Sequence, residues 1–263
     1  MSRQQEAVRN AGWASLFFCN HDQPRVVSRW GNDSDRESRE LSAKAFGMLL
    51  HMHRGTPYIY EGEELGMTNA HFTELGQYRD LEAINAYRQR VEEARCQSPE
   101  SMMAALALIG RDNARTPMQW DASRYAGFTP ADAATEPWIG VNPNHVEINA
   151  AEEFDDPDSV YGFYKKLIAM RHDSATVATG EWNLVAADSE QVYSFTRTGG
   201  DDTILVIVNL TDKTAQVPAE VAQLLEDGVG ESQVLLSTYD AVHSVKSVAR
   251  GELARWEGVV IQL

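Results

Sequence analysis

The sequence predicts an α/β fold followed by a separate antiparallel β domain. An apolar run at 15–19, a helical pattern at 34–52 and a second apolar run at 58–60 follow one another in the order strand, helix, strand. Since a crossover helix joins parallel strands, this order predicts a right-handed βαβ unit, either barrel-like or doubly wound. After about residue 179, short β-branched and aromatic runs alternate with turn signals, which is typical of an antiparallel sheet.

The helix between the two strands has recognisable ends. Ser34 and Glu37 have the spacing of a capping box, so we expect the helix to begin there. Gly55 and Pro57 are expected to end it, because neither residue favours a helix interior. Apolar residues recur at helical spacing between these ends, which predicts one buried face.

Residues 62–157 are too many for a plain connection and are expected to form an insertion. They hold two helical patterns, at 81–94 and 99–109, and then a segment rich in Trp, Pro and Gly. Long insertions at the carboxyl end of a strand commonly shape a pocket. A third helix, beginning near Pro157 and Asp158, would close the α/β part.

The chain is therefore expected to divide into an α/β part at 1–176 and a β domain at 177–263. The segment from Gly199 to Asp202 is a strong hairpin turn signal. The β domain should be an all-β antiparallel sandwich, with strands at 182–185, 192–196, 204–210, 234–238 and 259–263.

Charge and cysteine content argue against several classes of protein. The formal charge of −16 disfavours nucleic acid and anionic membrane surfaces, because both are bound through Lys and Arg. No segment approaches the ~18 apolar residues of a membrane span, and the start lacks the apolar core of a signal peptide. Cys19 and Cys96 do not form a disulfide framework, so we expect a cytoplasmic protein. The residue spacing suggests no metal site or phosphate-binding glycine loop, so no cofactor is expected.

The run NHDQPR, from Asn20 to Arg25, follows the first predicted strand directly. It places the imidazole of His21 and the carboxylate of Asp22 at the carboxyl end of that strand, where α/β folds hold their active sites. Two structural interpretations stay open from the residues alone. Asp22 could pair with Arg25, and His21 could be a packed strand-end histidine.

Six motifs resemble one family. Besides NHDQPR they are GTPYIYEGEELGMTN (55–69), YRDLE (78–82), RDNARTPMQW (111–120), AGFT (126–129) and YKKLIAMR (164–171). Together they closely resemble the C-terminal half of glycoside hydrolase family 13, the α-amylase superfamily. Within it, they look most like the oligo-1,6-glucosidase, α-glucosidase and trehalose-6-phosphate hydrolase branch. The similarity covers nearly the whole chain and is weaker in the β domain.

The resemblance implies that 1–176 is the C-terminal portion of a (β/α)₈ barrel, its last two βα units plus the insertion, because a complete barrel takes about 250 residues. The family acts with retention, which needs two carboxyl groups about 5–5.5 Å apart at the sugar. Both would lie upstream of Met1. We therefore expect the chain to be inactive alone and to need its N-terminal half as partner. The implied substrates are short α-linked glucosides, either oligosaccharides or disaccharides.

The resemblance also suggests roles for individual residues. Asp22 is similar to the third family carboxylate, which stabilises the transition state, and His21 and Arg111 are similar to positions that contact the sugar or the nucleophile. Arg115 is expected to brace the insertion. Supporting roles are expected for Asn20, Arg25 and Arg115.

Other conspicuous side chains are given structural interpretations. A charge cluster at a loop start is usually solvated or paired with a backbone terminus, so no catalytic role is assigned to Glu61, Glu63 and Glu64. Aromatic residues in insertions usually pack in the core, although they can stack on sugar faces. The three concerned are Trp120, Phe128 and Trp138.

Two alternative functions stay open. The run from His71 to Thr73 slightly favours a trehalose-6-phosphate hydrolase. The other alternative is a non-catalytic polypeptide, an interaction module or a remnant that keeps the family signature without the reaction. An exposed strand edge at 15–20 would make such a protein oligomeric or unstable alone.

Overall fold

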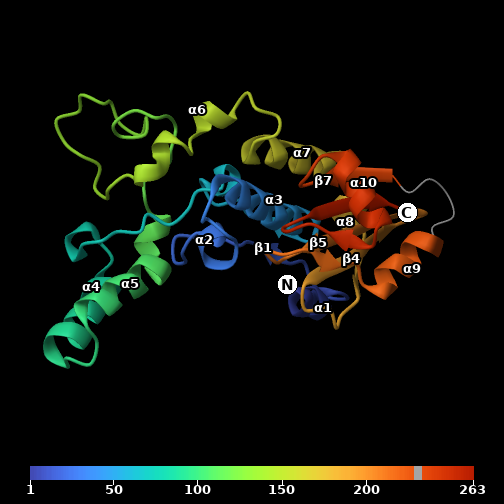
Figure 1. Ribbon diagram of the computed structural model, residues 1–263, viewed down its shortest axis with the longest axis horizontal. Coiled ribbons are helices and arrows are strands. Elements are labelled where there is room, and N and C mark those ends of the chain that lie inside the picture. Colours follow the sequence, from blue (N-terminus) through green and yellow to red (C-terminus); the bar gives the residue numbers. More distant parts are fainter. Residues whose placement is uncertain (228–232) are drawn as a thin grey trace. The chain divides into compact units, whose positions relative to one another are not determined.

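The computed structural model describes residues 1–227 and 233–263, which form two compact units. The first unit comprises Met1–Phe17, Ser34–Tyr58 and Phe163–Leu263, and the second comprises Phe18–Asp33 and Ile59–Gly162. All the described β-strands belong to the first unit, whereas the second unit consists of short helices and loops (Figure 1).

The predicted βαβ order is confirmed in the first unit. β1 (Ser15–Leu16) and β2 (Thr56–Pro57) pair in parallel, and α3 (Arg36–Met52) precedes β2 in the sequence. Each strand is shorter than predicted, because in the described residues the pair has no further neighbour to extend its ladder. Across residues 1–227 and 233–263 the parallel strands form no closed barrel.

Helix α3 begins at a different cap from the one that the sequence indicated. Ser34 is not the N-cap; Asp35 is, and its Oδ1 accepts the Ser38 N–H at 2.8 Å while Oδ2 accepts the Ser38 hydroxyl, also at 2.8 Å. A carboxylate can accept both hydrogen bonds at once, which a serine hydroxyl cannot do equally well. These bonds favour the ionised form and lower the pKa of Asp35.

The antiparallel sheet predicted for the C-terminal part is present. Five strands lie in the spatial order β3-β4-β5-β9-β7, and each lies within two or three residues of a predicted strand. The predicted hairpin turn is confirmed, because Gly199 pairs with Asp202 and Gly200 has a positive φ of 65°. The bounds are β3 (Glu181–Val185), β4 (Val192–Gly199), β5 (Asp202–Asn209), β7 (Gln233–Ser237) and β9 (Gly258–Gln262).

The prediction of an all-β domain is wrong, because α9 (Ala219–Asp227) and α10 (Ala241–Ala249) lie within it. In α9, Val221 and Leu225 have helical spacing and pack against the sheet. Asp240 caps α10 by accepting the His243 N–H at 2.7 Å. Valine has low helix propensity, and the packing of Val221 in α9 and Val248 in α10 against the buried cluster outweighs that preference.

One face of the five-stranded sheet has a mixed cover. Leu205 of β5 and Val259 of β9 belong to a buried cluster that also contains Val221 of α9. Ala215 and Leu253 complete the cluster from a small antiparallel sheet, formed by β6 (Ala215–Gln216) and β8 (Glu252–Leu253). On this face, a helix and a two-stranded sheet therefore take the place of a second full sheet.

Both predicted helices of the insertion are confirmed in the second unit. The first is α4 (Leu81–Tyr87), which continues as a π-helical turn (Arg88–Glu93), and the second is α5 (Pro99–Ile109). They share a core with the loop residues Phe72 and Ile139. The other elements of this unit are α2 (Val26–Trp30), α6 (Ala150–Glu153) and 3₁₀ turns at Glu63–Leu65, Leu75–Gln77, Arg111–Ala114 and Pro143–Val146.

The remaining helices are α1 (Ser2–Val8), α7 (Val160–Asp173) and α8 (Ala175–Thr179). The start of α7 agrees with the third predicted helix, two or three residues later than expected. Within the described ranges, no helix combines the length and the apolar character that crossing a membrane requires.

Candidate functional site

A tight turn presents the imidazole and the carboxylate that the sequence singled out. The Asn20 Oδ1 accepts the Asp22 N–H at 2.8 Å, which closes the turn. His21 Nε2 lies 3.3 Å from Asp22 Oδ2. The side chains of His21 and Asp22 are 70% and 52% exposed, so a ligand can reach both.

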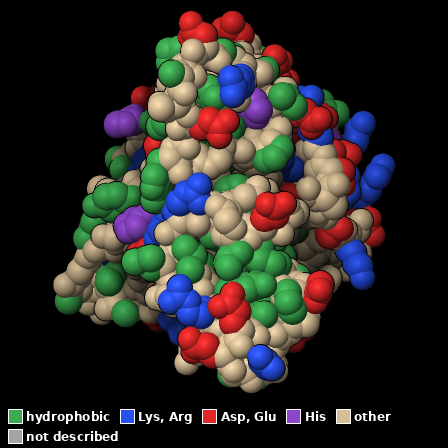
Figure 2. Space-filling view, turned by 90° about the vertical axis from the view of Figure 1, so that its left-hand side faces the viewer, with side chains coloured by type: hydrophobic (Ala, Val, Ile, Leu, Met, Phe, Trp, Pro, Cys, Tyr) green, Lys and Arg blue, Asp and Glu red, His purple; other side chains and the backbone are tan. Residues whose placement is uncertain are grey.

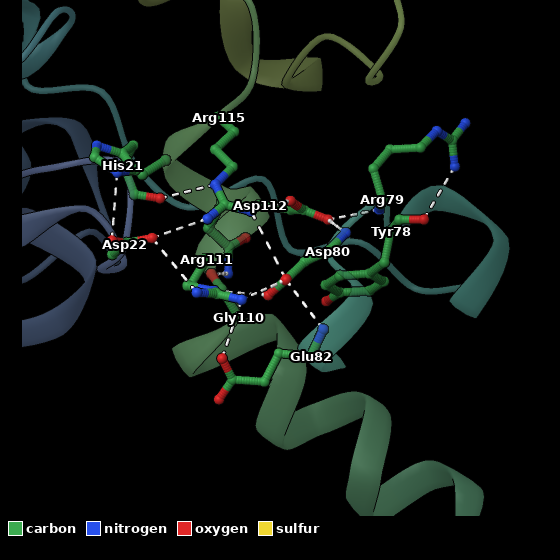
Figure 3. A network of polar contacts seen from close by, with 12 residues as sticks. His21, Asp22, Tyr78, Arg79, Asp80, Glu82, Gly110, Arg111, Asp112 and Arg115 are labelled. Atoms are coloured by element: carbon green, nitrogen blue, oxygen red, sulfur yellow. Dashed lines mark hydrogen bonds and ion pairs between the residues drawn. The ribbon is translucent and has the colours of Figure 1, made fainter. Parts of the chain in front are cut away.

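Two arginines from the insertion converge on Asp22 (Figure 3). Arg115 Nη2 donates to Asp22 Oδ1 at 3.0 Å, and Arg111 Nη1 donates to the same oxygen at 3.5 Å. Arg115 Nε also donates to the carbonyl oxygen of His21 at 2.8 Å. The sequence favoured Arg111 as the ligand contact, whereas the structure gives Arg115 the shorter contact with Asp22.

Behind the arginines lies a carboxylate that the sequence analysis missed. Asp80 receives two hydrogen bonds from Arg111, one from Nε at 2.9 Å and one from Nη2 at 2.6 Å. These bonds lower the pKa of Asp80, and Asp80 in turn raises the pKa of Arg111. Asp80 also caps α4 by accepting the Glu82 N–H. This N-cap position within the YRDLE motif is the sequence signal that could have identified it.

Asp112 joins the two segments that carry these side chains. It is fully buried, and its Oδ2 accepts the backbone N–H groups of Arg79 and Asp80 at 2.6 and 2.8 Å. Its Oδ1 lies 3.3 Å from Arg115 Nη1. Asp112 therefore fixes Arg115 and Asp80 together, so that three aspartates and two arginines form one network.

Arg25 lies on another side of the turn and has a structural environment. Its side chain is buried, its Nη1 donates to the Glu61 carbonyl at 2.6 Å, and its guanidinium stacks over the Tyr60 ring. Its N–H donates to Asn69 Oδ1 at 3.0 Å. Burial lowers the pKa of Arg25. In the described part of the chain Asp22 pairs with Arg111 and Arg115 and not with Arg25, so the simple loop pair that the spacing allowed does not form.

The glutamates after β2, expected to be solvated or paired with a backbone terminus, differ from one another in burial. Glu63 is buried and Glu64 is partly buried, and burial raises the pKa of Glu64. Only Glu61 of the three is exposed. Glu63 and Glu64 belong to the 3₁₀ turn at Glu63–Leu65, and the burial of this turn removes Glu63 from solvent.

The aromatic residues of the insertion also depart from expectation. Trp120, Phe128 and Trp138 do not pack in the core; they are 52%, 54% and 69% exposed. Other apolar residues of the segment, such as Tyr125 and Ile139, are buried instead. Exposed aromatic rings are free to stack on a sugar face.

A cavity of about 290 Å³ borders the network on the side of α4 and α5. Asp80, Glu82 and Arg111 supply its polar rim, and Met102 and Leu106 are among its apolar lining residues. On the side of the molecule that Figure 2 presents, hydrophobic side chains gather between acidic and basic ones in the lower part of the view. Such a cavity is compatible with a small organic ligand beside Arg111. Among the described residues, no group of three or more His, Cys, Asp or Glu side chains could hold a metal ion.

Comparison with known proteins gives consistent results. The chain matches the family model of the alpha amylase catalytic domain over residues 1–180. The oligo-1,6-glucosidase of Parageobacillus thermoglucosidasius is 42% identical over 265 residues, which cover all of this chain and 45% of that protein.

Solved structures agree with this relationship. The trehalose-6-phosphate hydrolase of Bacillus licheniformis has a TM-score of 0.86 at 39% identity, covering 99% of this chain and 45% of the other. The isomaltulose synthase of Protaminobacter rubrum has a TM-score of 0.83 at 34% identity, with coverages of 98% and 44%. The chain thus spans slightly less than half the length of the proteins it matches.

Proposed function

This chain belongs to the alpha-amylase family, and from that premise we propose that it is the C-terminal portion of a retaining α-glucosidase that acts on short α-linked glucosides. In this proposal, residues 1–176 supply the last two βα units of a (β/α)₈ barrel, with the insertion at 62–157, and residues 177–263 form the following β domain. The proposal includes a cytoplasmic location, which the cysteine content suggested.

The convergence of Arg111 and Arg115 on the exposed carboxylate of Asp22 is the observation that supports this function best. Glycoside cleavage passes through an oxocarbenium-like state that carries positive charge on the sugar. A carboxylate held in place by two guanidinium groups is preorganised to stabilise that charge and to accept hydrogen bonds from sugar hydroxyls. We assign this role to Asp22, and contacts with sugar hydroxyls to His21 and Arg111.

The nucleophile and the acid/base are assigned to polypeptide outside residues 1–263. Retention requires two carboxyl groups about 5–5.5 Å apart on either side of the anomeric carbon. The other aspartates of the network, Asp80 and Asp112, are buried and bound to arginine, so neither is available to attack a sugar. The relatives are more than twice as long as this chain, which supports a contribution from further polypeptide.

Complementation tests the proposal. The chain alone is expected to release no nitrophenol from p-nitrophenyl α-glucoside. Co-expression with the N-terminal part of the Parageobacillus relative should restore turnover, and Asp22→Asn in the complemented enzyme should abolish it. Arg3→Gln, at an exposed position of α1, serves as the control and should leave turnover unchanged. Turnover by the homogeneous chain alone would contradict the assignment.

A trehalose-6-phosphate hydrolase is the alternative within the same class. The likeness to the solved hydrolase of Bacillus licheniformis favours it, as does the run from His71 to Thr73. The complemented enzyme should be assayed with isomaltose, maltose, sucrose and trehalose 6-phosphate. Preference for the phosphorylated disaccharide would select the alternative over the oligo-1,6-glucosidase.

The non-catalytic alternative predicts a different outcome. If the chain is an interaction module or a remnant, complementation restores no turnover with any of the four sugars. Size-exclusion chromatography then tests the expected behaviour, because an exposed strand edge predicts an oligomer or an unstable protein, and a well-behaved monomer would contradict that expectation.

A further inference from the structure

A cavity of about 300 Å³ lies within the first unit and shares no lining residue with the network around Asp22. Arg9 and Asn10, which follow α1, and Arg54, which follows α3, supply much of its polar lining. Trp182 of β3 also lines it. The Gln5 side chain of α1 joins two of these segments by donating to the Arg54 carbonyl at 2.9 Å, and Arg9 joins β3 through Asn183.

The charges of the two lining arginines are poorly compensated. Among the described residues, no carboxylate lies within 4.0 Å of Arg54, whose guanidinium instead stacks over the Trp13 ring at 5.0 Å. Arg9 donates to the neutral Asn183 Oδ1 at 2.9 Å. Its one ion pair, with Glu6 at 3.4 Å, joins two exposed side chains, and such pairs contribute little.

Further positive charge is buried in the same unit. Arg197 is fully buried, and its guanidinium donates to the carbonyl oxygens of Gly180 and Met52. Arg171 donates to the carbonyls of His51 and other residues nearby. Carbonyl groups satisfy hydrogen bonds but cancel no net charge. Burial, together with the positive charges of Arg171 and Arg54, lowers the pKa of Arg197 to about 9.

The one acidic residue lining the cavity does not neutralise it. Glu181 of β3 is exposed and forms no ion pair with either arginine within 4.0 Å in the described part of the chain. Two lining cations therefore face one unpaired carboxylate, and the charge of Arg54 also acts on the buried Arg197. This local excess of positive charge occurs in a chain of net charge −16, where acidic partners for arginine are abundant.

We propose that this cavity is a phosphate-binding site in which Arg9 and Arg54 hold a doubly charged oxyanion, either inorganic phosphate or the phosphate group of a sugar phosphate. Planar guanidinium groups match the oxygen geometry of phosphate and bind it through paired N–H donors. Asn10 adds a neutral donor. A cavity of this volume also admits an organic group beside the phosphate, against the Trp182 side. The inference does not depend on the proposed glucosidase function.

Calorimetry with the 263-residue chain tests this site. Inorganic phosphate and glucose 6-phosphate are titrated in turn, and sodium chloride of matched ionic strength is the salt control. The variants are Arg54→Gln and Arg9→Gln. Arg3→Gln is the matched control, because it removes one exposed arginine from the same N-terminal helix without touching the cavity. Line broadening of the phosphate signal in ³¹P NMR provides a second measurement.

Both phosphate compounds are expected to bind the wild-type chain saturably, and Arg54→Gln is expected to weaken binding by about 10-fold or more. Arg9→Gln, at an exposed side chain, should weaken it as well, whereas Arg3→Gln should not. Tighter binding of glucose 6-phosphate would assign the site to sugar phosphates, and equal affinity would assign it to the oxyanion alone. The proposal would be overturned if the wild type and the three variants bound phosphate equally well, or if sodium chloride gave the same calorimetric signal.

Discussion

Arg111 donates two hydrogen bonds to Asp80, at 2.9 and 2.6 Å, while its third nitrogen lies 3.5 Å from Asp22 (Figure 3). Nε and Nη2 of the guanidinium are thus held by Asp80, while Nη1 is directed toward Asp22. Because two parallel N–H donors fix a guanidinium in both position and plane, Asp80 determines where Arg111 presents its remaining donor.

Asp80→Asn tests this positioning role. Asparagine keeps the helix cap of α4 but loses the charge and one acceptor toward Arg111, so the fold should persist while the arginine becomes less ordered. In the complemented enzyme we expect kcat/KM to fall about 10- to 100-fold. The matched control is Glu82→Gln, because the exposed Glu82 also touches Arg111, at 3.0 Å, and should matter less than about 2-fold. Equal effects of the two substitutions would contradict the role of Asp80.

Asp112→Asn should destabilise the second unit. The buried carboxylate accepts two backbone N–H groups and pairs with Arg115, and an amide would turn a donor toward those donors. The expected loss is about 2–4 kcal/mol in the free energy of unfolding, measured by urea denaturation. Asp132→Asn, at an exposed site in the same unit, should change stability by less than about 0.5 kcal/mol. If Asp112→Asn lowered the free energy of unfolding no more than Asp132→Asn does, the three contacts of Asp112 would not stabilise the unit.

His51→Phe is expected to improve stability in mild acid. Within residues 1–227 and 233–263 the buried ring nitrogens of His51 have no hydrogen-bond partner, and burial lowers the pKa of the imidazole to about 4. The unfolded chain therefore binds a proton below about pH 6.5 while the folded chain does not, and stability falls as the pH drops from that value toward 4, by up to about 1.4 kcal/mol per pH unit. Phenylalanine removes this loss and keeps the edge contact with Tyr164.

Urea midpoints between pH 7 and 4 measure the effect. The difference between His51→Phe and the wild type should grow as the pH falls. The exposed His172→Gln is the control and should follow the wild-type curve. Parallel curves for His51→Phe and the wild type would mean that the buried imidazole does not determine the acid sensitivity.

Gly47→Ala should destabilise the first unit although alanine favours helices. A Cβ at position 47 would lie 2.7 Å from Tyr164 Cε2, so α3 and α7 would have to move apart. We expect a loss of about 1–3 kcal/mol by urea denaturation. Gly76→Ala, where a Cβ meets nothing within 4 Å, should be nearly neutral. Combining Gly47→Ala with Tyr164→Leu should recover part of the loss, and no recovery would exclude this clash as the cause.

Local sequence signals predicted much of the architecture because they act within a few residues. The turn at Gly199 to Asp202 and helix α5 both follow from such signals. The all-β prediction failed in α9 and α10, where valines occupy helical positions. The packing of Val221 and Val248 against the buried cluster supplies stability that local propensity does not indicate.

The sequence by itself determined the βαβ order, the antiparallel sheet, and the choice of His21 and Asp22, because a motif directly after a strand fixes where its side chains emerge. Only the tertiary structure decided that Arg111 and Arg115 meet Asp22, that Asp80 and Asp112 hold those arginines, and that the insertion's tryptophans are exposed. Ion pairs between segments 31 to 93 residues apart depend on how loops close, and chain spacing carries no information about that closure.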